Sequence, residues 1–188
     1  MSAEDRGAQA REVALLPALD PEAVALDIET TGLTDSDSIT CVCVCGKDWR
    51  KAWVEPINVF EVCSALNRAP QIAAFNGGSF DIPFMQRAWA LSDTQVGLWM
   101  AKLVDPLYVV RGVFGTQQCV KLQSVLLRNG LEGKSGSGAD AVVLAREQRF
   151  QELLLYCEQD TQQCLELMRK KQILWTDEIT LTRDDAEH

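Results

Sequence analysis

Two carboxylates, Asp27 and Glu29, stand within an otherwise apolar run of this sequence. Residues 24–29 read Val-Ala-Leu-Asp-Ile-Glu, and the alternation of a β-strand places both acids on one face. Neighbouring carboxylates repel each other and resist transfer out of water, and a divalent cation would remove both costs. Hard cations such as Mg²⁺ and Mn²⁺ prefer oxygen ligands of this kind. The pair is therefore either a metal site or two solvated acids on a half-exposed strand.

A third carboxylate, Asp81, is expected in the first turn of a helix, shortly after Gly77 and Gly78. A negative charge at that position is stabilised by the helix dipole, which explains the residue without any function. The glycine pair suggests a second explanation, because glycine lets another backbone or a ligand come close. Both explanations stay open on these residues alone.

A fourth carboxylate, Asp160, falls on the apolar stripe of a long helix predicted over residues 150–171. A carboxylate that faces inward usually has a partner. Tyr156 lies four residues earlier and therefore on the same face. The two residues indicate either a functional site or a Tyr–Asp pair at the edge of the core. The apolar stripe consists of Phe150, Leu153, Leu154, Cys157, Cys164, Leu165 and Met168.

Taken together, three segments resemble the motifs of the DEDD superfamily of 3′–5′ exonucleases. They are ALDIETTGL (25–33), AFNGGSFDIPFM (74–85) and YCEQD (156–160), and the last has the Y-x-x-x-D form of the tyrosine subclass, DEDDy. The resemblance covers Val24 to Lys171. It is strongest to the proofreading domains of family-B DNA polymerases and to stand-alone RNase H-like relatives, and the loop GKSGSG (133–138) favours the latter. The histidine subclass does not fit, because His188 is the only histidine.

The resemblance implies a two-metal hydrolysis of phosphodiester bonds, with two Mg²⁺ or Mn²⁺ ions as cofactors. Asp27 would bridge both ions, and Glu29 and Asp160 would complete the site that holds the attacking water. Asp81 would support the second ion directly or through water, and Tyr156 would orient the attacking water. The implied substrate is the 3′ end of single-stranded DNA or RNA, and the product is a nucleoside 5′-monophosphate. The implied substrate-binding residues are Thr30, Thr31, Gly32, Leu33, Asn76, Phe80 and Lys134.

The net charge of the chain bears on how strongly it can bind nucleic acid by itself. A formal net charge of −9 counts against a strong stand-alone binder of nucleic acid and is compatible with recruitment by a protein partner. Residues 102–149 hold seven bases and four acids, a balance of +3 that suits a nucleic-acid strand as well as an ordinary solvated face. Two alternatives therefore stay open. They are an exoribonuclease that trims RNA 3′ ends and a catalytically silent nucleic-acid-docking module of the same fold.

The predicted elements suggest an α/β fold, and the resemblance makes it RNase H-like, with a mixed, mostly five-stranded sheet flanked by helices. Pro106 argues against a central strand over residues 103–110, which stay unassigned. Ser79 is expected to cap the second helix. The predicted strands are 24–29, 39–45, 51–54 and 72–75, and the predicted helices are 58–68, 79–90, 119–128, 139–146 and 150–171.

The domain is expected over residues 21–175, between a loosely ordered lead-in (1–20) and an acidic, frayed tail (176–188). Cys41, Cys43 and Cys45 share one face of a strand, and we expect them to be small buried residues rather than zinc ligands. The sequence has neither a signal peptide nor an apolar run of about 20 residues, so we expect a soluble intracellular protein without a membrane partner.

Overall fold

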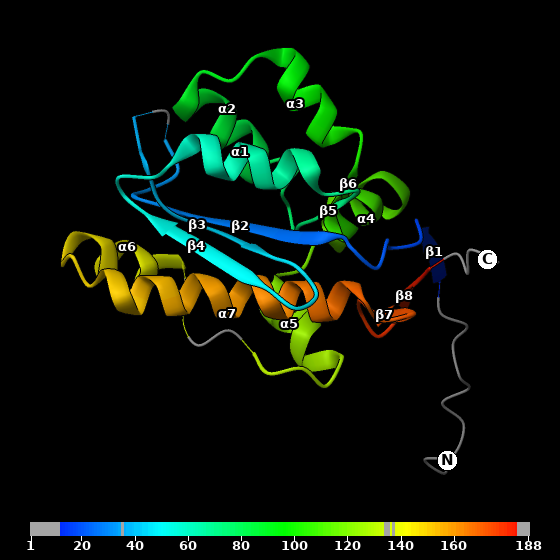
Figure 1. The fold of residues 1–188 in the computed structure, drawn as a ribbon. Coiled ribbons are helices and arrows are strands. Elements are labelled where there is room, and N and C mark those ends of the chain that lie inside the picture. Colours follow the sequence, from blue (N-terminus) through cyan, green and yellow to red (C-terminus); the bar gives the residue numbers. More distant parts are fainter. Residues whose placement is uncertain (1–11, 35, 134–135, 137, 184–188) are drawn as a thin grey trace, which may run out of the picture.

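A mixed five-stranded sheet lies at the centre of the computed structural model, which describes residues 12–34, 36–133, 136 and 138–183 (Figure 1). Its strands, in spatial order, are β4 (Arg50–Val54), β3 (Ile39–Cys45), β2 (Val24–Thr30), β5 (Ile72–Ala73) and β6 (Leu103–Val104). The strands β2, β3 and β4 form an antiparallel meander, whereas β5 and β6 join β2 in parallel. The predicted α/β fold with a mixed five-stranded sheet is confirmed.

Helices cover both faces of this sheet (Figure 1). The strands β2 and β3 are buried on both sides, so their side chains alternate between two cores. Val24, Leu26 and Ile28 pack toward one set of helices, and Cys41, Cys43 and Cys45 pack on the opposite face. The predicted burial of the three cysteines is confirmed. The first set is α1 (Val59–Arg68), α2 (Asp81–Trp89) and α3 (Asp93–Met100), and the second includes α5 (Leu122–Arg128), α6 (Gly138–Arg146) and α7 (Phe150–Met168).

The longest described helix, α7, crosses the sheet on the cysteine-bearing face. Leu153, Cys157, Cys164 and Met168 are buried along the predicted stripe, and Asp160 is buried among them at 1% exposure. The helix ends at Met168, three residues before the predicted end. Among the residues that the structure describes, no helix combines the length and the apolar character needed to cross a membrane.

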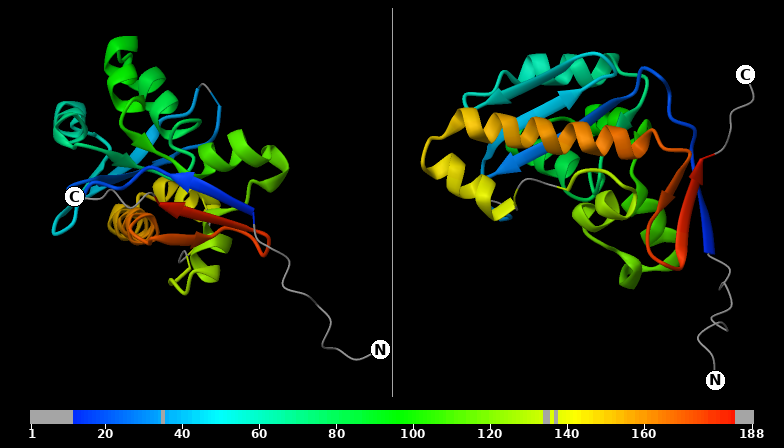
Figure 2. Two further views of the ribbon diagram at one scale, coloured as in Figure 1. Left: turned by 90° about the vertical axis from the view of Figure 1, so that its right-hand side faces the viewer. Right: turned by 90° about the horizontal axis from the view of Figure 1, so that it is seen from below.

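A second, three-stranded sheet joins the two ends of the described chain (Figure 2). Its strands are β1 (Glu12–Leu16), β8 (Ile179–Arg183) and β7 (Gln172–Leu174). The expectation of a loosely held lead-in is wrong for residues 12–16, and that of a frayed tail is wrong for residues 179–183. The reason is mutual burial, because β1 pairs in parallel with β8 and both send apolar side chains into the core.

Four local expectations also need correction. Helix α3 was not predicted, and residues 106–114 form helix α4 (Pro106–Phe114) where no element was assigned. Pro106 occupies the first turn of α4, which needs no amide donor, and the carboxylate of Asp105 caps that helix. Ser79 does not cap α2. The N-cap position is Phe80, and the Ser79 hydroxyl instead accepts a hydrogen bond from Arg111. Residues 116–118 form a short 3-10 helix before α5, which begins at Leu122 rather than at residue 119.

Candidate active site

The central strand β2 directs Asp27 and Glu29 toward the face that α7 covers. Ala25 belongs to the core on that face, whereas Leu26 and Ile28 belong to the core under α1 and α2. The predicted alternation of this strand is therefore confirmed. Glu29 is only 8% exposed, and Asp27 is half-buried. The pairing between β2 and β3 is irregular after Glu29, so the strand leaves regular register directly behind the second carboxylate.

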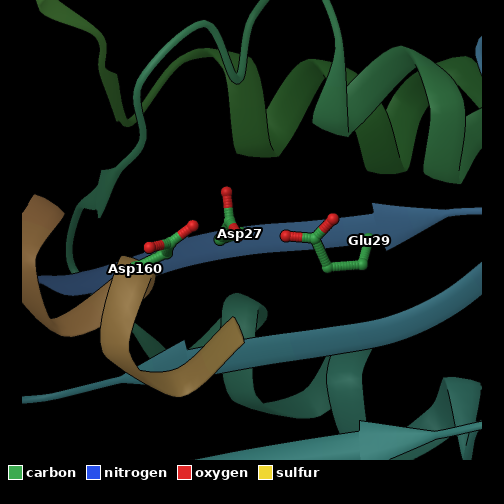
Figure 3. A group of neighbouring side chains, drawn as sticks. All are labelled: Asp27, Glu29 and Asp160. Carbon is green, nitrogen blue, oxygen red and sulfur yellow. The ribbon is translucent and has the colours of Figure 1, made fainter. Parts of the chain in front are cut away.

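Asp160 brings a third carboxylate to the same place. Ligand oxygens of Asp27, Glu29 and Asp160 all lie within 4.8 Å of one another (Figure 3). Two of these carboxylates come from one strand and the third from α7, so the site exists only when the helix packs on the sheet. Charges of one sign at this separation repel, and burial removes the water that would screen them. A set of buried carboxylate oxygens suits a hard divalent cation such as Mg²⁺ or Mn²⁺.

Cys157 supports the carboxylate cluster from one turn earlier on α7. Its Sγ lies 3.9 Å from both the main-chain oxygen and Oδ2 of Asp27, and it donates a weak hydrogen bond to them. Hydrogen bonding with Cys41 and Cys43, together with burial, raises the pKa of the Cys157 thiol well above its ordinary value. The thiol therefore stays protonated and able to donate. The sequence pattern predicts only a core position for Cys157, although its place on the stripe of Asp160 is a usable signal of this contact.

Asp81 lies beside β2 but outside this group of three carboxylates. It is 4% exposed, and its Oδ1 accepts a hydrogen bond of 3.1 Å from the main-chain N–H of Ile28. The strand β2 pairs with β5 only at Val24 and Ala25. The N–H of Ile28 lies beyond the end of this ladder, and Asp81 provides its hydrogen-bond acceptor. The carboxylate thus ties α2 to the strand that carries Asp27 and Glu29.

The glycine pair before Asp81 has a packing role. A Cβ on Gly77 would stand 2.4 Å from the Cβ of Ala74, and one on Gly78 would stand 3.0 Å from Leu103. The close approach suggested by the sequence therefore brings the chain onto itself, at the turn between β5 and α2.

Asn76 is held in the same turn by residues that sequence reasoning missed. It has a positive φ of 70°, and its main-chain N–H donates to Asp105 Oδ1 at 3.1 Å. Asp105 Oδ2 also accepts from the N–H of Gly78, and Arg111 donates to the Asn76 side chain. Burial raises the pKa of Asp105. The pair Asp105–Pro106 is a usual start of a helix, and that signal could have identified the carboxylate.

The last residue of β2 and the turn that follows it supply four of the residues expected to contact substrate. Thr30 is buried and donates to the main-chain oxygen of Gly32 at 2.6 Å, whereas Leu33 is 81% exposed. Thr31 donates to Asp37 Oδ1, and that carboxylate also accepts two hydrogen bonds from Thr34. These hydrogen bonds, those from Thr34 first, lower the pKa of Asp37. Asp37, which the sequence did not single out, therefore organises this turn.

Tyr156 is buried one turn before Asp160 and lines a cavity of about 280 Å³ beside the loop that precedes α6. A Cβ on Gly136 would lie 3.4 Å from its ring, so Gly136 lies directly against Tyr156. Phe80 packs on Phe84 with ring centroids 5.6 Å apart, against the core on the α1 side of the sheet. Lys134 lies outside the described residues.

Comparison with known proteins agrees with this geometry. A family model described as the RNase H superfamily matches residues 24–172. No curated protein matches the chain. Among solved structures, the family B DNA polymerase from the hyperthermophilic archaeon Pyrobaculum calidifontis is similar, with a TM-score of 0.58 and 14% identity. The similarity covers 76% of this chain and 23% of the polymerase chain, and at this identity it shows the fold alone.

Proposed function

Because the chain belongs to the RNase H superfamily, a group with a nuclease fold, we propose that it is a metal-dependent 3′–5′ exonuclease of the DEDD type, tyrosine subclass. The observation that carries this proposal is the convergence of Asp27, Glu29 and Asp160 within 4.8 Å. The proposed substrate is the 3′ end of single-stranded DNA or RNA, and the proposed product is a nucleoside 5′-monophosphate.

The carboxylate cluster would hold two divalent cations, Mg²⁺ or Mn²⁺. When bound, such cations stabilise the negative charge that develops on a phosphodiester and make water a stronger nucleophile. Asp27 stands between the other two carboxylates in Figure 3, which suits a residue shared by both cations. Glu29 and Asp160 would complete the site beside the attacking water. The burial of Glu29 and Asp160 keeps bulk water from competing for their oxygens.

Asp81 and Tyr156 would have supporting parts. Asp81, which accepts the N–H of Ile28, would support the second cation directly or through water. Tyr156 would orient the attacking water by a hydrogen bond. A phenol with an ordinary pKa near 10 is protonated at neutral pH, so it serves this purpose as a hydrogen-bond partner rather than as a base.

The terminal nucleotide would contact the two turns that border the cluster. One turn carries Thr30, Thr31, Gly32 and Leu33, and the other carries Asn76, followed by Phe80. Both turns are organised by carboxylates, Asp37 and Asp105, so the backbone at these contacts is preorganised. The exposed side chain of Leu33 would pack on a base. Lys134 would contact the strand farther from its end.

Digestion of end-labelled oligonucleotides tests the proposal. Single-stranded and duplex DNA and RNA, labelled at the 5′ end, would be incubated with Mg²⁺ or Mn²⁺, next to a closed circular single strand. The proposal predicts labelled products that shorten by one nucleotide at a time and an intact circle. Cleavage of the circle at a comparable rate contradicts the exonuclease assignment. Digestion of RNA alone would identify an exoribonuclease, and metal binding without digestion of any substrate would identify a silent docking module.

A further inference from the structure

A second cavity, bordered by charged side chains, lies near the C-terminal end of α7, beyond the carboxylate cluster. Its volume is about 260 Å³. Four separate segments meet there: the chain before β2, the β3–β4 hairpin, the residue that follows α7, and the end of β8. Figure 2 shows the C-terminal end of α7 beside β7 and β8. The lining residues are Leu19, Asp20, Pro21, Lys47, Arg169 and Arg183.

Three of the six lining residues are cations, and one is an acid. This excess of positive charge stands out in a chain with a formal net charge of −9. Lys47 and Arg169 are exposed, so their charges are available at the mouth of the cavity. Asp20 is engaged in its own turn, where its Oδ1 accepts the N–H of Glu22 at 2.7 Å. Arg169 alone could be explained by the negative end of the α7 dipole, but Lys47 and Arg183 come from other elements.

Arg183 is the residue whose environment points to a ligand. Its guanidinium donates to the main-chain oxygen of Pro17 at 2.6 Å and makes a weak contact to the sulfur of Met168. Its Nε is buried and has no hydrogen-bond partner among the described residues. Burial lowers the pKa of this guanidinium to about 10. A half-buried cation with a buried, unpaired N–H is stabilised by an anion close to it.

Other arginines of the described chain differ from Arg183, because they form ion pairs with acidic side chains. Arg50 pairs with Glu158, Arg128 with Asp177, and Arg149 with Glu147 and Glu152. Within residues 12–34, 36–133 and 138–183, no acidic side chain forms such an ion pair with Arg183. The small sheet therefore brings a half-buried guanidinium to a cavity that two further cations border, and in the described part of the chain no carboxylate forms an ion pair with it.

We propose that Lys47, Arg169 and Arg183 form a binding site for a phosphate group. Guanidinium and ammonium groups are the side chains that bind phosphate oxygens best, and a cavity of this volume accommodates a single phosphate with room for its ester substituents. The phosphate belongs either to the backbone of a nucleic-acid strand or to a free phosphate ester. Arg169 follows Asp160 by nine residues, a separation of about 14 Å along a helix. The site is thus distinct from the carboxylate cluster and goes beyond the proposed hydrolysis.

Binding measured in the presence of a chelator tests the site without requiring any hydrolysis. The probes are a fluorescein-labelled 12-nucleotide oligothymidylate, followed by anisotropy, and inorganic phosphate and thymidine 5′-monophosphate, followed by NMR chemical shifts. The test variant is the double substitution Lys47→Gln with Arg169→Gln. The matched control is Arg68→Gln with Lys170→Gln, which removes the same charge from positions outside the cavity. Lys47, Arg68 and Arg169 are exposed and Lys170 is half-buried, and circular dichroism verifies that both variants fold.

We expect the test variant to bind the oligothymidylate about 10-fold more weakly, and the magnitude of the slope of log K against log salt to fall by about 0.7, as for one lost phosphate contact on a single strand. The control should stay within about twofold of the wild type. Weaker binding of the monophosphate alone, limited to the test variant, assigns the site to a free phosphate ester. Equal weakening in both variants, or no weakening for any probe, overturns the proposal. A wild type that binds but never hydrolyses would refute the exonuclease instead and leave this site standing.

Discussion

A carboxylate oxygen of Asp27 on β2 lies within 4.8 Å of a carboxylate oxygen of Asp160 on α7. The two residues come from distant parts of the chain, and only the packing of α7 on the sheet brings them together. Folding therefore forces negative charges into one buried place, at a cost in free energy that evolution tolerates when the site has a use.

Removing one of these charges should relieve that cost. Asp160→Asn should leave the metal-free protein as stable as the wild type or more stable. In the wild type, Mn²⁺ at about 100 times its dissociation constant should raise the Tm by about 5–10 °C, and the variant should lose most of this increase. Differential scanning calorimetry measures both effects. Asp48→Asn, an exposed acid outside the cluster, is the control. A variant that is unfolded without metal would show that Asp160 has a structural role.

Tyr156 should contribute to turnover but not to metal binding. Tyr156→Phe keeps the buried ring and removes only the hydroxyl, so turnover should fall by about 10–1000-fold because the attacking water is less well oriented. The stabilisation by Mn²⁺ should stay that of the wild type. Single-turnover digestion and calorimetry provide the two readouts. Unchanged turnover would mean that Tyr156 only packs beside Asp160, and the tyrosine-subclass assignment would be withdrawn.

Gly77 should be irreplaceable for a steric reason. Gly77→Ala brings a Cβ to 2.4 Å from that of Ala74, and we expect a loss of about 1–3 kcal/mol in the free energy of unfolding. Gly112→Ala, on helix α4, meets nothing within 4 Å and should gain about 0.5–1 kcal/mol. Urea denaturation compares the two. If Gly77→Ala is as stable as Gly112→Ala, the turn before α2 is not packed as described.

Asp37 should make the stability of the turn after β2 depend on pH. Hydrogen bonds from Thr34 and Thr31 lower the pKa of Asp37 in the folded chain. A lowered carboxyl pKa contributes stability above the unfolded value of about 3.9, and the contribution disappears as the pH falls through the folded pKa. The difference in unfolding free energy between the wild type and Asp37→Ala should therefore be larger at pH 7 than near pH 2–3. An equal difference at both pH values would contradict the ionic origin of these hydrogen bonds.

The sequence predicted those parts of the fold whose signals are local. The alternation of residues 24–29 and the stripe of residues 150–168 placed Asp27, Glu29 and Asp160 on faces that the structure confirms. Sequence patterns did not predict contacts between segments that lie far apart in the chain. The pairing of β1 with β8 joins segments at opposite ends of the chain, and neither is distinctive alone. For the same reason, the contacts of Asp105 with Asn76 and Gly78, and the cavity around Arg183, became visible only in three dimensions.

The central claim, a cation-dependent exonuclease built on the carboxylate cluster, is tested most directly by one digestion. Wild type and Asp27→Asn, both freed of metal, would be given a 5′-labelled single strand with chelator or with added Mn²⁺. We predict a ladder that shortens from the 3′ end for the wild type with Mn²⁺, and at least about 1000-fold slower digestion in the other three reactions. Undiminished digestion by the wild type in chelator, or by Asp27→Asn with Mn²⁺, would contradict the account.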